Sequence, residues 1–87
     1  MLRVSFDKKA GAIYIKISDN EVKKTIEFAP ETFVDLDSTG KLVGVEMLRP
    51  GKLEIIGRIA KTYNAPMLKE MDPTCIPKFF TNRHSYA

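Results

Sequence analysis

The feature that most constrains the fold is a series of short stretches in which apolar and polar residues alternate. Residues 2–7 alternate in this way, and residues 12–18 repeat the pattern with isoleucine at every second position. Successive side chains of a strand point to opposite faces, so each stretch predicts a strand with one apolar face. Less regular stretches at 21–28, 32–37 and 42–48 bring the prediction to five strands.

The connections between these stretches are short and rich in residues that form turns. Asp19 and Asn20 both tolerate the positive φ of a two-residue hairpin turn, which predicts a tight hairpin between the second and third strands. Residues 37–41 fit a type I turn, with Asp37 at its first position and Gly40 in the left-handed conformation. Short connections throughout predict an antiparallel meander, in which strands adjacent in sequence pair.

One amphipathic helix is predicted after the strands, over residues 53–63, because its apolar residues recur at spacings of three and four. Asn64 is suited to a left-handed helix stop, and Pro66 prevents continuation. The predicted fold is therefore α+β: a five-stranded antiparallel β-meander with one C-terminal helix packed on the sheet. Residues 1–66 form one domain in this interpretation, and residues 67–87 form an irregular tail that contains prolines.

The residue inventory excludes several kinds of site. The chain has 87 residues, one Cys and one His, so it cannot close an internal disulfide or hold a structural zinc ion with its own thiolates and imidazoles. It contains no glycine-rich phosphate loop and no nucleophile elbow. We therefore predict no catalytic residues, no metal site and no cofactor.

One group of carboxylates is a candidate for cation binding or acid–base chemistry: Asp35, Asp37 and Glu46. Pairing through the predicted turn places Asp37 opposite Lys41 and Asp35 opposite Val43, and it turns Glu46 toward the other face. This geometry disfavours a site with three carboxylates. The residue pattern favours a turn-forming role for Asp37 instead.

The stretch 42–48 is apolar at both parities, so both of its faces require cover. One helix can cover only one face of a sheet, which predicts a homodimer or a protein partner on the second face. An alternative is that the tail folds under the sheet. The candidate interface residues are Tyr14, Phe33, Val43, Val45, Met47, Phe79 and Phe80.

Charge is distributed unevenly along the chain. Residues 1–48 carry a net charge of −1 and residues 49–87 carry +4, although the basic residues form no run. Nucleic-acid binding is therefore an alternative function, with Arg49, Lys52, Arg58 and Lys61 as the basic-surface candidates.

The N-terminal residues have no apolar signal region, and the longest apolar runs fall far below the roughly 20 residues of a membrane span. We expect a cytoplasmic protein without membrane association.

Residues 4–17 and 34–48 resemble a family of short prokaryotic proteins, the domain of unknown function 2283. The resemblance covers about residues 2–50. Phe6 stands where members typically have tyrosine, and Gly11 where they have a second aspartate. The resemblance implies a small sheet-plus-helix protein and carries no activity. Some members are similar, by their arrangement beside a toxin-like protein, to the antitoxin half of a two-component pair.

These patterns together predict a non-catalytic protein-interaction module that acts as a homo-oligomer, and the resemblance to the family implies an antitoxin-like role. Nucleic-acid binding through the basic C-terminal part is the alternative. A small enzyme or a cation-binding protein that uses the three carboxylates is the third hypothesis.

Overall fold

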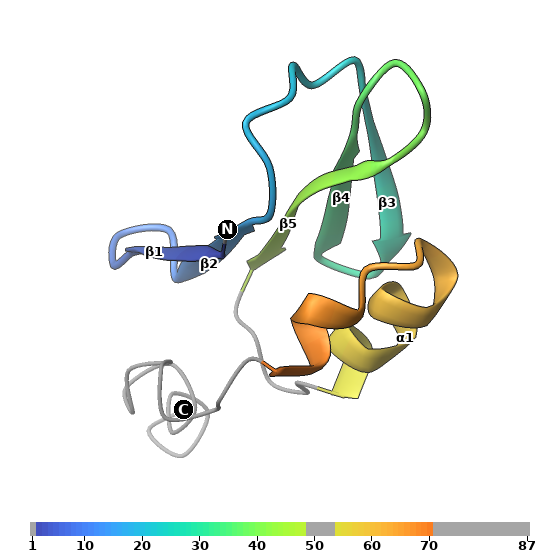
Figure 1. The fold of residues 1–87 in the computed structure, drawn as a ribbon. Helices are drawn as coiled ribbons and strands as arrows, with labels where there is room; N and C mark the ends of the chain where they lie inside the picture. The colour runs from blue at the N-terminus through green and yellow to red at the C-terminus, as the bar shows by residue number, and fades with distance from the viewer. Residues whose placement is uncertain (1, 49–53, 71–87) are drawn as a thin grey trace.

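A computed structural model of the chain describes residues 2–48 and 54–70 (Figure 1). Within these residues it confirms the five strands and one α-helix that follows them. The elements are β1 (Arg3–Asp7), β2 (Ala12–Lys16), β3 (Lys24–Ala29), β4 (Thr32–Leu36), β5 (Leu42–Leu48), α1 (Glu54–Thr62) and the 3-10 helix η1 (Pro66–Glu70).

All strand pairs are antiparallel, and the strand order is β1-β2-β5-β4-β3. The predicted meander is therefore wrong at one connection, because β2 pairs with β5 and not with β3. The backbone N–H of Ile17 donates to the carbonyl of Val43 over 2.8 Å, so the chain follows β5 beyond the end of β2. It then reaches the far edge of the sheet, where the N–H of Lys23 donates to the carbonyl of Leu36 over 2.8 Å.

Burial explains why β5 takes the central position. Residues 42–45 and Met47 are all buried, whereas the edge strands β1 and β3 contain only exposed and half-buried residues. A strand that is apolar on both faces exposes the least apolar surface to solvent when it lies in the centre of the sheet, between two other strands. The isoleucine-rich β2 lies on one side of β5, and β4 lies on the other.

An irregularity in the β4–β5 pairing changes which residues share a face. Val34 pairs with Val45 and Asp35 with Gly44, but Leu36 then pairs with Leu42, so Val43 is passed over. The expected pairing of Asp35 with Val43 is therefore wrong. Such a bulge places two residues of one strand opposite one residue of its partner.

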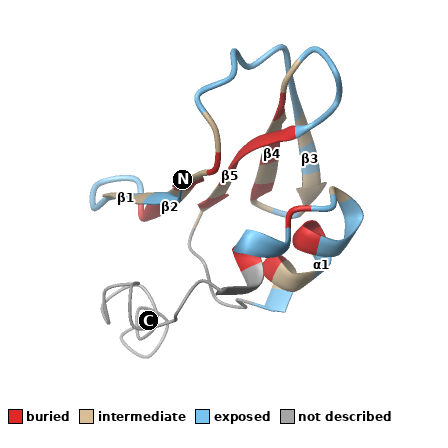
Figure 2. Ribbon diagram, viewed as in Figure 1, coloured by how far each residue is buried: buried red, intermediate tan, exposed pale blue. Residues whose placement is uncertain are grey.

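The core lies between one face of the sheet and α1, which contributes Ile56, Ile59 and Ala60 (Figure 2). We call this sheet face the covered face. Its buried members are Ile13, Ile15, Ile17, Val34, Leu36, Leu42, Val45 and Met47. Leu68 of η1 is 1% exposed and belongs to the same cluster, so the core includes a residue beyond position 66.

The end of α1 follows the prediction from sequence. Asn64 has a φ of 53°, and the N–H of Ala65 donates to the carbonyl of Ala60 over 2.8 Å. This is the bond of a helix that stops at a left-handed residue. The stop turns the chain back so that Ala65 and Leu68 can close the core.

Candidate protein-contact face

The sheet face opposite α1 is formed by the alternate residues of each strand, and we call it the open face. One row of paired residues crosses all five strands through Tyr14, Glu46 and Phe33, and a second row crosses through Lys16, Gly44 and Asp35. The remaining members of the open face are Arg3, Ser5, Asp7, Ala12, Thr25, Glu27 and Leu48. Tyr14, Phe33, Glu46 and Leu48 are half-buried.

Tyr14 lies across β5 instead of standing away from the sheet. Its hydroxyl donates a 2.8 Å hydrogen bond to Oδ2 of Asp35 on β4, two strands away from its own β2. Gly44 lies between the two strands, and a Cβ at this position would overlap the hydroxyl and the ring of Tyr14. The absence of a side chain at Gly44 is therefore what allows the ring to take this path.

Asp35 is held from both sides. Its Oδ1 accepts a 2.6 Å hydrogen bond from the hydroxyl of Thr25 on β3, and its Oδ2 accepts the bond from Tyr14. Burial of the phenol, the hydrogen bond to Asp35, and the negative charges of Asp35 and Glu46 together raise the pKa of Tyr14 well above its usual value. Tyr14 therefore acts as a neutral hydrogen-bond donor, and the network joins β2, β4 and β3 across the central strand β5.

Glu46 shares the open face with Asp35, contrary to the sequence-based expectation. The bulge at Val43 is the physical reason, because it shifts the β5 residue opposite Asp35 by one position. Asp37 lies beyond the strands, in the β4–β5 turn. Among residues 2–48 and 54–70, no three His, Cys, Asp or Glu residues lie close enough to hold a metal ion.

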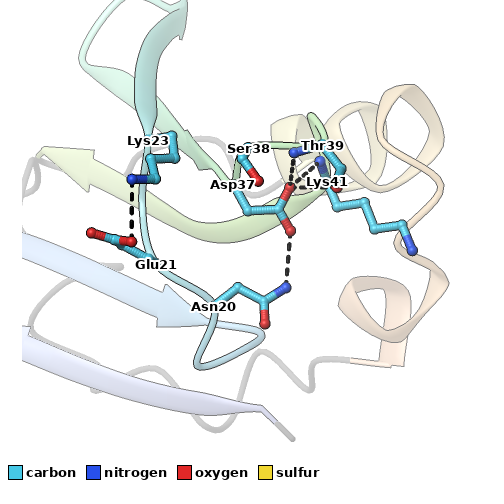
Figure 3. A pocket seen from close by; sticks show the side chains of 7 residues that line it. All are labelled: Asn20, Glu21, Lys23, Asp37, Ser38, Thr39 and Lys41. Carbon is cyan, nitrogen blue, oxygen red and sulfur yellow. Dashed lines mark hydrogen bonds and ion pairs between the residues drawn. The ribbon is translucent and has the colours of Figure 1, made fainter.

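Asp37 is occupied by the turn that it begins (Figure 3). Its Oδ1 accepts hydrogen bonds from the N–H and hydroxyl of Thr39, at 2.8 and 2.6 Å, and from the N–H of Lys41 at 3.0 Å. Its Oδ2 accepts a 2.9 Å bond from the amide of Asn20, which fastens the β2–β3 connection to this turn. The Thr39 hydroxyl and the Asn20 amide are the main causes that hold the pKa of Asp37 well below its usual value.

These groups surround a hollow of about 400 Å³, which Glu21, Lys23 and Ser38 also line. The ammonium of Lys23 lies 3.2 Å from the carboxylate of Glu21. In Figure 3 the Lys41 ammonium points away from Asp37. Both carboxylates that line the hollow are thus already engaged, Glu21 with Lys23 and Asp37 with the turn and Asn20, which fits a structural role in holding the loop.

The predicted interface residues separate into three groups. Tyr14 and Phe33 lie on the open face, as expected from their strand parity. Val43, Val45 and Met47 are at most 3% exposed, so these three side chains are buried within the single chain. Val45 and Met47 pack in the core with α1, because their parity on β5 is that of the covered face. Phe79 and Phe80 lie outside the described residues.

Two of the four basic candidates can be placed. Arg58 and Lys61 are exposed on α1, and the guanidinium of Arg58 lies 5.5 Å from the centre of the Phe28 ring. Arg49 and Lys52 lie outside the described residues. α1 therefore presents two cations, and one of them, Arg58, covers the Phe28 ring at the edge of the core.

Sequence reasoning missed Gly44, Thr25 and Leu48 as members of the open face. A glycine inside an otherwise apolar strand was the available signal, since it often marks a bulge or a close approach by another group. Both occur here, with the bulge at Val43 and the Tyr14 ring over Gly44. No sequence signal connects Thr25 with Asp35, which lie ten residues apart.

No helix in the described part of the chain has the length and apolarity of a membrane span. Comparison with curated proteins and with solved structures gives no match. A family model described as protein of unknown function, DUF2283, matches residues 3–49, which is more than half of the chain. The matched region contains all five strands and both the Tyr14–Asp35 and the Asn20–Asp37 hydrogen bonds. The chain therefore belongs to the DUF2283 family of proteins of unknown function.

Proposed function

We propose that this protein is a non-catalytic protein-interaction module that self-associates through the open face. The observation that carries the proposal is that α1 covers one face of the sheet and, among the described residues, leaves the other face without a helix. α1 packs on the covered face, while the open face carries Tyr14, Phe33 and Leu48 as half-buried apolar surface. Aromatic residues in a rigid setting are the usual anchors of protein interfaces, because they bury large area with little loss of conformational freedom.

The network around Asp35 supports a binding role more than a catalytic one. Both oxygens of Asp35 accept hydrogen bonds from the chain itself, and the raised pKa keeps Tyr14 protonated. A general base needs a free acceptor within reach of its substrate. In this arrangement the polar groups form hydrogen bonds with one another and hold the Tyr14 ring in place over Gly44. A side chain held in this way suits a preformed contact surface.

The charges of the open face favour a second copy of the chain as the occupant. Arg3 and Lys16 outweigh Asp7 on the β1–β2 side, whereas Glu27 and Asp35 make the β3–β4 side acidic, in the same row as the two basic residues or the adjacent row. A twofold axis parallel to β5 would stack β1 and β2 of one copy over β3 and β4 of the other. Two sheets packed face to face in this way would bring each basic side over an acidic side.

Sedimentation velocity over a range of concentrations tests this proposal. We expect the wild-type chain to dimerise and Phe33→Ser to weaken dimerisation by about tenfold or more, because truncation of a central aromatic anchor costs about 2 kcal/mol. Val22→Ser is the matched control, since Val22 is an exposed apolar residue, 43% accessible, that lies outside the open face. A wild-type chain that remains monomeric, or equal effects of the two substitutions, would overturn the proposal.

A further inference from the structure

We propose that β1 forms a second, separate contact between two copies of this chain, by antiparallel pairing of β1 with β1 of the other copy. The twofold axis of this contact passes through Ser5 and joins two five-stranded sheets edge to edge. This inference rests on the sheet edges and on the β1 sequence. It does not depend on the open face, and the two contacts can exist together.

The two edges of the sheet differ in how well they are protected. β1 and β3 are the end strands. The pairing of β3 with β4 is interrupted between Glu27 and Ala29, and Pro30 follows directly. Bulges and prolines are among the devices by which proteins prevent an edge from pairing with another chain.

β1 shows neither device. It pairs with β2 in unbroken register over all five of its residues, from Arg3 to Asp7, and it contains no proline. No described strand lies on its outer side, where alternate backbone N–H and C=O groups face away from β2. The edge therefore offers a regular template of hydrogen-bonding groups for another extended strand.

The β1 sequence is complementary to itself in this arrangement. With the axis at Ser5, Arg3 lies opposite Asp7 of the other copy, and this charge pair occurs twice. Val4 lies opposite Phe6, also twice, on the face that packs against the core. An axis at Val4 or at Phe6 would lose both charge pairs, and a slip by one residue would bring opposite faces together.

Arg3 and Asp7 can both form these ion pairs. Arg3 is exposed, and among the described residues no carboxylate forms an ion pair with it. Oδ1 of Asp7 accepts hydrogen bonds from the N–H groups of Lys9 and Ala10, at 3.0 and 3.1 Å. The described chain places no hydrogen bond on Oδ2 of Asp7, so this oxygen can accept from a guanidinium across the axis.

Disulfide trapping in the full-length chain tests the position of the axis. In a Cys75→Ser background, Ser5→Cys places two thiols across the twofold, where paired Cα atoms are about 4.5–5.5 Å apart. This separation lies within the reach of a disulfide. Glu27→Cys is the matched control, because Glu27 is exposed on the same face of the opposite edge strand.

Under mild oxidation we expect covalent dimer from Ser5→Cys to form at least about tenfold faster than from Glu27→Cys, because pairing holds the two thiols in place. Equal rates for the two variants would overturn the proposal. Adding Phe33→Ser to the Ser5→Cys chain distinguishes this contact from the open-face contact. The cross-link persists if β1 pairing is independent, whereas loss of the cross-link would show that only the open face brings the chains together.

Charge complementation provides a second test. Arg3→Glu and Asp7→Lys each place like charges opposite one another, so each variant alone should dimerise through β1 about tenfold less tightly. In a mixture of the two variants opposite charges face each other again, and mixed dimers should form. Failure of the mixture to restore cross-linking of Ser5→Cys would overturn the proposed register.

Asp7→Asn protects this test against a folding defect. The Asn side chain retains an Oδ1 that can accept the turn bonds from Lys9 and Ala10, while it removes the charge. We expect Asp7→Asn to relieve the repulsion in Arg3→Glu and to increase cross-linking of that variant. Unchanged cross-linking would contradict the proposed pairing of Arg3 with Asp7.

Discussion

The covered face and the open face of the sheet differ in what holds their side chains in place. On the covered face, Ile13, Ile15, Val34 and Val45 are fully excluded from solvent and pack in the hydrophobic cluster to which α1 also contributes. On the open face, a chain of hydrogen bonds through Asp35 holds Tyr14 across the gap at Gly44. Hydrophobic burial therefore fixes the side chains on one side of this sheet, whereas hydrogen bonds fix Tyr14 on the other side.

The largest expected effect is on the covered face. Ile15 is 0% exposed, and its replacement by Ala leaves a cavity in the core cluster. We expect Ile15→Ala to lower the free energy of unfolding by about 2–5 kcal/mol and Ile15→Val by about 0.5–1.5 kcal/mol. Urea denaturation measures both values. A loss for Ile15→Ala no larger than that for Phe33→Ala on the open face would break the distinction between the two faces.

The second prediction concerns the gap at Gly44. A Cβ there would displace the Tyr14 hydroxyl, so Gly44→Ala should lose the bond to Asp35 and destabilise the fold by about 1 kcal/mol. In a Tyr14→Ala background the obstacle is gone, and the same substitution should stabilise by about 0.5 kcal/mol, because alanine restricts the unfolded chain more than glycine does. A double-mutant cycle in urea measures this change of sign. The same sign in both backgrounds would refute the proposed path of the Tyr14 ring.

A third prediction tests how α1 sits on the covered face. A Cβ at Gly57 would meet no described atom within 4 Å, apart from its near neighbours in the helix. Gly57→Ala should therefore stabilise the helix by as much as about 1 kcal/mol. Gly40→Ala is the contrasting variant, because Gly40 also has open space but a φ of +85°, and it should destabilise. Thermal denaturation of both variants checks the pair, and a destabilising Gly57→Ala would mean that α1 lies closer to its neighbours.

The smallest effect is the alkaline titration of Tyr14. Its pKa is raised in the folded state above the ordinary value of 10.0, so the folded chain retains a proton that the unfolded chain loses. The stability from this group is complete below pH 10.0 and declines as the pH rises above that value. Tyr14→Phe should remove this part of the decline, and it should remove one phenolate from the absorbance change above pH 10.0. Identical alkaline curves for the two chains would contradict the burial and bonding of Tyr14.

Local pattern predicted most of the covered face. The alternation of residues 12–18 gave the inward isoleucines correctly, and the spacing of apolar residues gave α1 with its stop at Asn64. These features depend on residues that are close in sequence, so one sequence is enough to predict them. The choice of α+β architecture followed from the same information.

Strand order and the open face could not be predicted in the same way. Asp19 and Asn20 fit a hairpin turn locally, but β2 pairs with the central strand β5 and not with β3. The amide of Asn20 instead bonds Asp37, seventeen residues later. The bulge at Val43 shifts the register of β5 by one residue, and this shift places Gly44 and Glu46 on the open face with Asp35. Pairings between distant segments set these features, and alternation within one segment carries no information about them.

The most direct test of the central claim is a series of two-dimensional NMR spectra recorded over increasing protein concentration. Self-association through the open face predicts that the signals of Tyr14, Phe33 and Leu48 shift with concentration, while those of Ile56 and Ile59, which α1 contributes to the core, remain in place. Self-association with unchanged signals from Phe33 and Leu48, or spectra that do not depend on concentration, would contradict the account.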